Sequence, residues 1–466
     1  MRKPHDPAPR PLTLGDLIAW SNGVSHLGAD AREKTAPRIL NDSRMIKPGD
    51  VFVAIATDKN DGHRFVGAAF AAGAAAAIVD KRATIECTAG DRAKLIAVAD
   101  PLAAVQRAAA RYRREIGCLI IGVTGSSGKT TTRRFIAAAL GSIFPVCETW
   151  SNWNNHLGVP LSILRFKGDE WAGVIEMGAN HTGEISVLSK IARPDIAVVT
   201  NIGYAHAGLF GTLSNTARAK FEILDGLNKK EGFLLANGDD KRVVAEAKRS
   251  GIKSVYFGCS RTCSVHPDRV RFDPAAGLDF EVDGYAFHLN ARGRHFLYSA
   301  LPAIYLGRRC GVPDEKIASS LAAVKPLDMR GAIGKKKRVA FIVDCYNANP
   351  SSMKSAIEQL VAMAAPRRRM AVVGDMLELG RNAPRLHREL GTLLVKNGVR
   401  KIVAVGEFAD EVAKGAVKAD PGMNGLAAVK TAAEAVAPLH AMVAPGDIVL
   451  LKGSRGVHLE TVYENF

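Results

Sequence analysis

The stretch LIIGVTGSSGKTTTRRF, residues 119–135, constrains the fold more than any other part of this 466-residue sequence. An apolar run enters a turn rich in glycine and serine, and the turn ends in Gly-Lys-Thr. This order is typical of a strand, a phosphate-binding loop and a helix. The sequence therefore predicts a nucleotide-binding sheet here. The loop alone does not indicate the reaction, because a motor, a kinase, a switch and a ligase can all carry one.

The loop departs from the general phosphate-binding pattern, in which a glycine stands five residues before the Gly-Lys pair. Val123 occupies that position. The remaining glycines still allow backbone N–H groups to turn toward an anion, and Lys129 can neutralise the β- and γ-phosphates. A Gly/Ser turn with an incidental lysine is the alternative. We expect the nucleotide to contact Thr124, Gly125, Ser126, Ser127, Gly128, Lys129, Thr130 and Thr131.

Composition excludes several classes of protein. The chain is 47% hydrophobic and 23% charged, as in soluble globular proteins, and its length predicts about three domains. The longest apolar run, residues 65–79, is too short for a membrane span, and the start of the chain lacks the apolar core of a signal peptide. The seven cysteines are scattered without a CxxC pair, which favours a reducing cytoplasm.

The formal net charge of +17 indicates either an anionic partner or a basic surface that aids solubility, and both interpretations stay open. The basic residues form only short clusters, at residues 111–114, 335–338 and 367–369. We therefore expect small anionic molecules rather than nucleic acid as partners.

Apolar strands alternate with helical segments along most of the chain. From residue 118 the strands include LIIGVTG, WAGVIEMG and DIAVVTNIG, and from residue 338 they include RVAFIVD, RMAVVGD and DIVLLKG. Continuous apolar strands separated by helices predict parallel sheets that are covered on both faces. We predict an α/β fold with three domains: residues 1–115, a central P-loop-type domain over residues 116–325, and a Rossmann-like domain over residues 326–466.

Three polar residues after the loop are candidates for the chemistry. Glu176 ends the next apolar strand, at the sheet edge where ligands collect, so metal coordination is favoured over capping of the next helix. His206 follows the third strand in the same edge layer, and a structural histidine bonded to the backbone is its alternative. Lys220 follows on a helix, where an isolated lysine is ordinarily solvated.

Motifs along the chain resemble the Mur ligase family. GVTGSSGKTTT, ETWSNWNNHLGVPLSIL, IEMGANHTGEI and NIGYAHAGLFGT resemble its ATPase domain, and TGSSGKT is that family's form of the loop. NDSRMIKPGDVFVAIATDKNDGHRF resembles the amino-terminal domain that holds a UDP-sugar. VDCYNANPSSMKSAI, VVGDMLELG, His387 and LLKGSRG resemble the carboxy-terminal domain. These motifs occur in the expected order over nearly the whole chain.

The resemblance implies an ATP-dependent amide ligase. In this family ATP phosphorylates a substrate carboxylate, and an amine then attacks the acyl phosphate. The chain is most similar to the members that join D-alanyl-D-alanine to UDP-N-acetylmuramoyl-tripeptide in peptidoglycan precursor synthesis. The resemblance therefore implies these small-molecule substrates, ATP and Mg²⁺ as cofactors, and a cytoplasmic monomer without a membrane span.

The same resemblance assigns the catalytic residues as Lys129, Glu176, His206 and Lys220. Thr130 and Glu176 would hold a first Mg²⁺, and His206 a second one near the acyl phosphate. Lys220 matches a family lysine that carries a carbamate in several members. Carbamoylation would turn its ammonium into an anionic metal ligand.

Further positions match ligand-binding residues of the family. Those implied to contact ATP are His295, Arg330 and Asp344. Those implied to bind substrate are Ser43 and Arg44 near the UDP portion, Asn152, Asn154, Asn155 and Asn180 on the acyl side, and Asn347 and Asn349 near the dipeptide. Ordinary turn chemistry is the alternative for these asparagines.

Three departures from the family pattern keep other functions open. Phe296 and Ser299 stand where asparagines near the nucleotide base are expected, Val343-Asp344-Cys345 replaces Asp-Asp-Ser, and the DGH stretch lacks its preceding glycine. One alternative is a Mur-type amide ligase that acts on a different carboxylate and amine pair. A non-catalytic nucleotide-binding protein is a second alternative, and a nucleic-acid-binding protein is a third.

Overall fold

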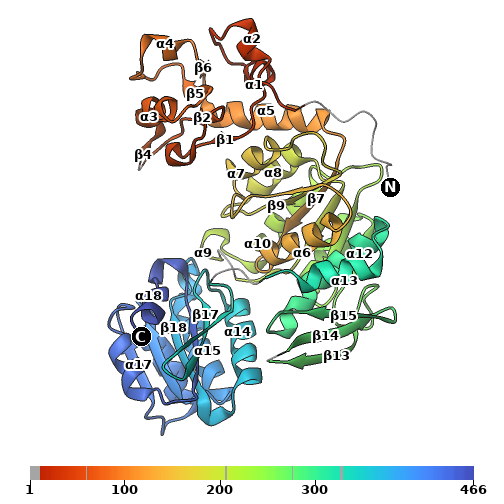
Figure 1. Cartoon of the computed structure of the whole chain (residues 1–466). Helices are drawn as coiled ribbons and strands as arrows, with labels where there is room; N and C mark the ends of the chain where they lie inside the picture. The colour runs from red at the N-terminus through yellow and green to blue at the C-terminus, as the bar shows by residue number, and fades with distance from the viewer. Residues whose placement is uncertain (1–10, 59, 205–206, 275, 326–328) are drawn as a thin grey trace.

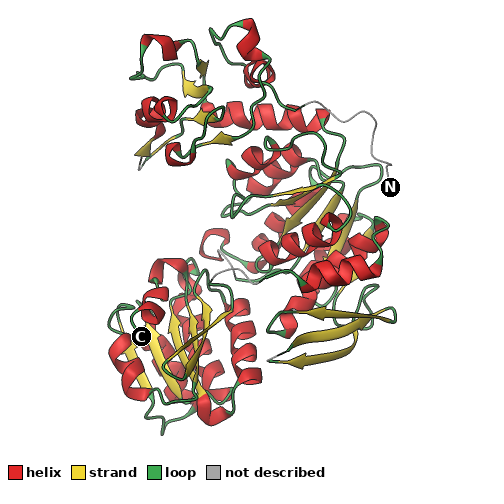
Figure 2. Cartoon of the chain, viewed as in Figure 1, coloured by secondary structure: helices red, strands yellow, loops and turns green. Residues whose placement is uncertain are grey.

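The computed structural model describes residues 11–58, 60–204, 207–274, 276–325 and 329–466. Figure 1 shows an amino-terminal part at the top, a central part, and a carboxy-terminal part below it. Helices surround mostly parallel sheets, which confirms the predicted α/β fold (Figure 2). None of the helices within these ranges combines the length and apolarity that crossing a membrane requires.

The amino-terminal part contains a four-stranded parallel sheet in the order β1-β2-β5-β6. The strands of this part are β1 (Ile39–Leu40), β2 (Val51–Val53), β3 (Ala56–Thr57), β4 (Asn60–Asp61), β5 (Ala76–Asp80) and β6 (Leu95–Val98). Its helices are α1 (Leu14–Ser21), α2 (Ala29–Arg32), α3 (Val66–Ala71), α4 (Ala89–Arg92) and α5 (Pro101–Glu115). The strands of the sheet are short and mostly buried, as expected for parallel strands with covered faces.

Helix α5 joins the amino-terminal part to the central part. Asp100 caps its first turn, and Pro101 presets the backbone at the first helical position. Near the other end, the buried Arg113 side chain donates hydrogen bonds to the carbonyls of Ala192 (2.7 Å) and Arg193 (3.1 Å). The two parts are therefore tied together by buried polar contacts as well as by the chain.

The central part contains six parallel strands in the order β12-β11-β10-β7-β9-β8. They are β7 (Leu119–Thr124), β8 (Val146–Glu148), β9 (Ala172–Glu176), β10 (Ile196–Val199), β11 (Phe233–Asn237) and β12 (Ser254–Phe257). The helices are α6 (Lys129–Gly141), α7 (Gly158–Ile163), α8 (Glu184–Ala192), α9 (Ala207–Phe210), α10 (Leu213–Phe221), α11 (Lys241–Ser250), α12 (Leu297–Arg309) and α13 (Asp314–Ala322). A separate antiparallel sheet consists of β13 (Asp268–Asp273), β14 (Gly277–Val282) and β15 (Tyr285–Leu289).

Strand β7 explains how this sheet positions a site. Ile120 packs into the core on one face, and Ile121 and Val123 pack into the core on the other, so a continuous apolar run is needed. β9 and β10 flank β7 on opposite sides, and all three run parallel. Their carboxyl ends therefore meet at one edge, and the residues that follow these strands gather there.

The carboxy-terminal part contains a six-stranded sheet in the order β16-β17-β21-β18-β19-β20, with β16 antiparallel. The strands are β16 (Ala332–Lys336), β17 (Val339–Asp344), β18 (Arg369–Gly374), β19 (Lys401–Val405), β20 (Leu426–Val429) and β21 (Ile448–Lys452). The helices are α14 (Pro350–Met363), α15 (Ala383–Lys396), α16 (Ala409–Ala419), α17 (Val436–Met442) and α18 (Glu460–Glu464). The predicted boundary at 325/326 touches residues outside the described ranges, and the division at 115 and 325 stays a prediction.

Candidate active site

The loop between β7 and α6 has the backbone geometry of an anion-binding turn. Gly125 (φ +147°) and Gly128 (φ +77°) adopt conformations that favour glycine. A Cβ atom on Gly125 would lie 1.9 Å from Thr200 Oγ1, so no larger residue fits. Thr200 Oγ1 donates to the Ser127 carbonyl (2.7 Å), and the Ser127 N–H donates to Asn201 Oδ1 (2.9 Å). The residues after β10 thus hold the loop at the N-terminus of α6, which favours an anion.

Lys129 begins α6 and is half-buried. Its Nζ donates a hydrogen bond to the Gly125 carbonyl (2.9 Å). Burial lowers the pKa of the Lys129 amine, and the nearby Glu176 carboxylate opposes this shift. The next residue, Thr130, has a buried side chain. Lys129, which is predicted to bind phosphate, and Thr130, whose hydroxyl is predicted to bind Mg²⁺, are therefore adjacent in the first turn of α6.

Glu176 ends β9, and 1% of it is exposed. Its N–H donates to Thr149 Oγ1 (2.8 Å), and Asn154 Nδ2 donates to its Oε1 (2.8 Å). Its Oε2 has no hydrogen-bond partner among the described residues, and Arg133 Nε lies 3.6 Å away. A buried carboxylate oxygen that lacks a partner fits a cation ligand. Asn154, predicted on the acyl side, orients this carboxylate.

Lys220 is buried on α10 rather than solvated, and 1% of it is exposed. Its Nζ lies 5.1 Å from the centroid of the Phe210 ring. Burial lowers the pKa of Lys220 to about 7, and the charge of Lys129 contributes. A lysine with this pKa is partly neutral at neutral pH.

His206 lies outside the described residues. Within the described ranges, no group of three or more His, Cys, Asp or Glu side chains is placed to hold a metal ion. The other three predicted metal ligands, Thr130, Glu176 and Lys220, lie within the described ranges and are all buried.

A cavity of about 1050 Å³ extends from the loop to the carboxy-terminal part. It brings together most of the predicted site residues: Ser126, Ser127, Gly128, Lys129, Thr130, Thr131, Asn152, Asn154, Asn155, Glu176, Asn180, His295, Arg330, Asp344, Asn347 and Asn349. Predicted residues from five separate places in the sequence thus line one space.

Five predicted residues within the described ranges do not line this cavity. Thr124 and Gly125 form the end of β7 and the start of the loop, and Lys220 is buried on α10. Ser43 and Arg44 lie in a 3-10 turn of the amino-terminal part, Ser43–Met45, where the exposed Arg44 side chain pairs with Asp42 (2.7 Å).

The carboxy-terminal wall contains two residues that the sequence analysis missed. The Arg330 guanidinium lies 4.1 Å from the centroid of the Tyr346 ring. Lys452, of which 1% is exposed, donates from Nζ to Asp344 Oδ2 (2.7 Å) and to the Asn347 carbonyl (3.0 Å). A lysine at the end of the apolar strand IVLLK was the available signal, because burial of an ammonium requires anionic or carbonyl partners.

The two asparagines predicted near the dipeptide have local roles. Asn349 accepts from the Ser352 N–H (2.9 Å) and caps helix α14. Asn347 Oδ1 accepts from the N–H of Ala348 (2.8 Å). Both side chains also line the cavity, so their turn chemistry places polar groups at its wall.

Two residues that depart from the family pattern, Phe296 and Ser299, contact neighbours within the central part. The Phe296 ring lies 4.4 Å from the His295 ring and 6.4 Å from the Phe135 ring, measured between centroids. Ser299 Oγ accepts a hydrogen bond from Thr132 Oγ1 (3.0 Å). Burial lowers the pKa of His295 to about 4, so its imidazole is neutral at neutral pH. This wall of the cavity offers an apolar ring surface to a ligand.

Three family models match the chain in sequence order. They are "Mur ligase family, catalytic domain" over residues 38–113, "Mur ligase middle domain" over residues 123–307, and "Mur ligase, glutamate ligase domain" over residues 330–455. The UDP-N-acetylmuramoyl-tripeptide–D-alanyl-D-alanine ligase of Bacillus subtilis (strain 168) is 34% identical and aligns over 92% of both chains. The ligase of the same name from Escherichia coli (strain K12) is 32% identical over 97% of both chains.

Solved structures show the same similarity in three dimensions. A crystal structure of MurF from Acinetobacter baumannii has a TM-score of 0.85 and 31% identity, and covers 98% of this chain and 99% of that chain. MurF ligase from Thermotoga maritima, solved in complex with ADP, has a TM-score of 0.78 and 28% identity. The match covers 92% of this chain and 96% of that chain. With matches over all three parts of the fold, the chain belongs to the Mur ligase family.

Proposed function

We propose that the chain is an ATP-dependent carbon–nitrogen ligase that joins D-alanyl-D-alanine to UDP-N-acetylmuramoyl-tripeptide in peptidoglycan precursor synthesis. Relatives with that name, 30–34% identical over nine-tenths of the chain, support the choice of substrates. The ADP complex of the Thermotoga maritima relative supports ATP as the nucleotide. The observation that carries the proposal is the cavity that joins the phosphate loop and Glu176 to Arg330 and Asp344.

The proposed reaction explains why cationic side chains line this cavity. A carboxylate does not react with an amine at neutral pH, because oxide is a poor leaving group. A carboxylate oxygen of the tripeptide bonds to the γ-phosphorus of ATP as the bond to ADP breaks. The dipeptide amine then attacks the acyl carbon and loses a proton, and phosphate leaves. Both steps bring anions together, so Lys129 and Arg330 stabilise them by charge and position.

Thr130 and Glu176 fit a Mg²⁺ site. Thr130 offers a hydroxyl, and Glu176 offers the buried oxygen that lacks a hydrogen-bond partner. His206 would hold a second Mg²⁺, and Lys220 would be a ligand when carbamoylated. Bound Mg²⁺ neutralises phosphate charge. Asn154 holds Glu176 in a fixed orientation through its hydrogen bond.

The remaining assignments follow the family order. Residues 1–115 would bind the UDP-sugar-peptide with Ser43 and Arg44, residues 116–325 would bind ATP and the acyl group, and residues 326–466 would contact ATP and the dipeptide. The ATP contacts would include His295, Arg330 and Asp344. The acyl side would be formed by Asn152, Asn154, Asn155 and Asn180, and the dipeptide side by Asn347 and Asn349. We place the enzyme in the cytoplasm as a monomer.

The test is phosphate release by purified protein with ATP, Mg²⁺, UDP-N-acetylmuramoyl-tripeptide and D-alanyl-D-alanine, with each substrate omitted in turn. We expect turnover that requires both substrates and is lost in Lys129→Met. ATP binding without turnover on this pair would contradict the proposal. It would favour a Mur-type ligase of another carboxylate and amine, the alternative that the three departures from the family pattern keep open.

A further inference from the structure

One cluster beside the loop contains most of the unpaired buried polar atoms of the described chain. Six buried side-chain nitrogen or oxygen atoms in the described ranges lack a hydrogen-bond partner, and four of them belong to Arg133, Glu148 and Glu176. These four are Arg133 Nε and Nη1, Glu148 Oε2 and Glu176 Oε2. Because buried polar groups are almost always paired, such a concentration calls for a physical explanation.

The cluster is formed by α6 and the ends of two adjacent strands. Arg133 lies one helical turn after Lys129, and 4% of its side chain is exposed. Glu148 ends β8 and Glu176 ends β9. Arg133 Nε lies 3.5 Å from Glu148 Oε2 and 3.6 Å from Glu176 Oε2. The guanidinium is therefore shared almost equally between two carboxylates and is hydrogen-bonded to neither.

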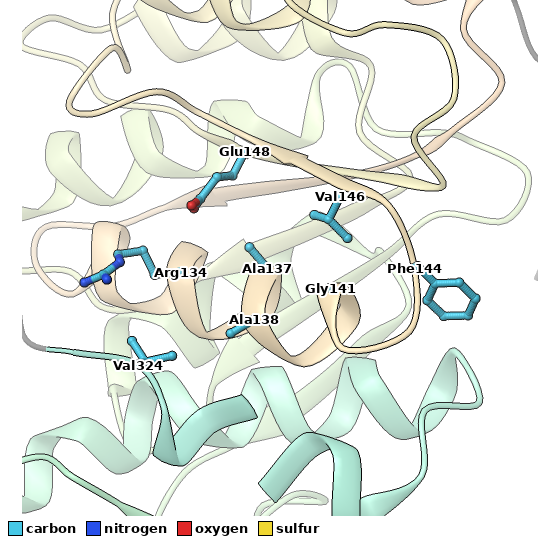
Figure 3. Close-up of a pocket in the computed structure, with 8 residues that line it drawn as sticks. All are labelled: Arg134, Ala137, Ala138, Gly141, Phe144, Val146, Glu148 and Val324. Carbon is cyan, nitrogen blue, oxygen red and sulfur yellow. The ribbon is translucent and has the colours of Figure 1, made fainter. Parts of the chain in front are cut away.

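The two carboxylates differ in their access to water. The Glu176 side chain is 2% exposed, whereas the Glu148 side chain is 40% exposed. Figure 3 shows Glu148 pointing from β8 toward α6, beside a cavity of about 360 Å³ that is lined by Arg134, Ala137 and Gly141 among others. Solvent can thus reach the Glu148 side of the cluster. Glu148 supplies a negative charge beside Arg133, and it can be substituted without disturbing the packing of the core.

We propose that Arg133 is a positioning residue for Glu176, and that Glu148 sets how strongly Arg133 engages it. The inference rests on the proposed function, in which Glu176 is a Mg²⁺ ligand. Attraction to Glu148 keeps the guanidinium from closing a hydrogen bond on Glu176 Oε2, and that oxygen stays available to a cation. Without Glu148, Arg133 pairs with Glu176 and competes with the cation. Without the Arg133 charge, two carboxylates attract the cation together.

The test measures Mn²⁺ binding directly, with Mn²⁺ in place of Mg²⁺. Free Mn²⁺ is followed by electron paramagnetic resonance in the presence of protein and a non-hydrolysable ATP analogue. We expect Glu148→Gln to raise the Mn²⁺ Kd about fivefold and Arg133→Met to lower it by a similar factor, a change equivalent to about 1 kcal/mol. The double variant Glu148→Gln with Arg133→Met should return close to the wild-type Kd.

The controls separate this effect from loss of structure. Arg249→Met removes the same charge from the last turn of α11, where the exposed guanidinium pairs with Glu246, and should change the Kd less than twofold. Arg133→Lys, which keeps the charge, should stay near wild type. If Arg133→Met fails to fold, the double variant decides: a Kd near that of wild type supports the inference, and a Kd as high as that of Glu148→Gln contradicts it.

The outcomes distinguish this inference from the proposed metal site. A merely structural cluster would weaken binding in both single variants, and that result, or no change in either, would overturn the inference. Glu176→Gln serves as the reference and should weaken Mn²⁺ binding strongly. If Glu176→Gln has no effect, the assignment of Glu176 as a metal ligand fails, and the inference fails with it.

Discussion

At the scale of single residues, the site depends on side chains whose charge or orientation other groups control. Arg330 is held against the ring of Tyr346, and a cation–π contact of this kind contributes about 0.5–2 kcal/mol. Tyr346→Leu should therefore raise the KM for ATP about threefold to tenfold with a smaller change in kcat. Steady-state kinetics checks this. Tyr346→Phe keeps the ring and should retain the wild-type KM; an equal rise in both variants would contradict the stacking role.

The chemistry of Lys220 depends on its burial. Its pKa of about 7 leaves about 10% of the amine neutral at pH 6 and about 90% at pH 8. Only the neutral amine adds to CO₂, with release of a proton, so carbamate should increase over this range. Incubation with ¹³C-bicarbonate and ¹³C NMR should show a carbamate signal that grows with pH and is absent in Lys220→Arg. The same signal in both proteins would place the label on another amine.

At the scale of elements, α15 contains a buried histidine that links this helix to the segment after β18. His387 Nδ1 donates to the Ala383 carbonyl (2.7 Å), and its Nε2 accepts from the Met376 N–H (2.9 Å). Burial lowers the pKa of His387 below the value of about 6.5 in the unfolded chain. The unfolded state therefore takes up a proton first as the pH falls, and the free energy of unfolding should decrease below about pH 6.5.

The measurement is urea unfolding of wild type and His387→Leu between pH 7.5 and 5.5. At pH 7.5 the variant should be less stable by about 1–3 kcal/mol, because the Met376 N–H loses its acceptor. The difference should shrink as the pH falls. A difference that stays constant over this range would show that His387 does not titrate on unfolding.

The elements also show how far sequence reasoning reaches. The loop, Glu176 and the edge of the central sheet could be predicted, because strand ends and glycine turns are local patterns. Two pairs could not be predicted from the sequence: Arg133 with Glu148, and Lys452 with Asp344. Each pair joins elements that only the strand order and register bring together. Lys220 was expected in solvent by itself, and the packing of α10 buries it.

At the scale of the whole molecule, the central and carboxy-terminal parts meet at a close backbone contact. The Gly208 N–H donates to the Glu378 carbonyl (2.6 Å), and a Cβ on Gly208 would lie 2.7 Å from the Gly380 nitrogen. Because Arg330 and Asp344 line the cavity from the carboxy-terminal side, this contact helps to set the distance across the site.

Gly208→Val should separate the two parts. The clash with backbone atoms costs about 1–3 kcal/mol if the parts do not move, so the variant should show a larger radius of gyration by small-angle X-ray scattering and a higher KM for ATP. Leu209→Ala changes an exposed neighbour in α9 and should leave both values unchanged. An unaltered radius in Gly208→Val would mean that the contact does not govern the arrangement.

The central claim is that ATP activates a carboxylate by phosphorylating it. The most direct measurement uses UDP-N-acetylmuramoyl-tripeptide with ¹⁸O in its terminal carboxylate, together with ATP, Mg²⁺ and D-alanyl-D-alanine, and analyses the products by mass spectrometry. The mechanism predicts one ¹⁸O atom in each released phosphate, with ADP as the nucleotide product. Unlabelled phosphate, or ¹⁸O recovered in AMP, would contradict it.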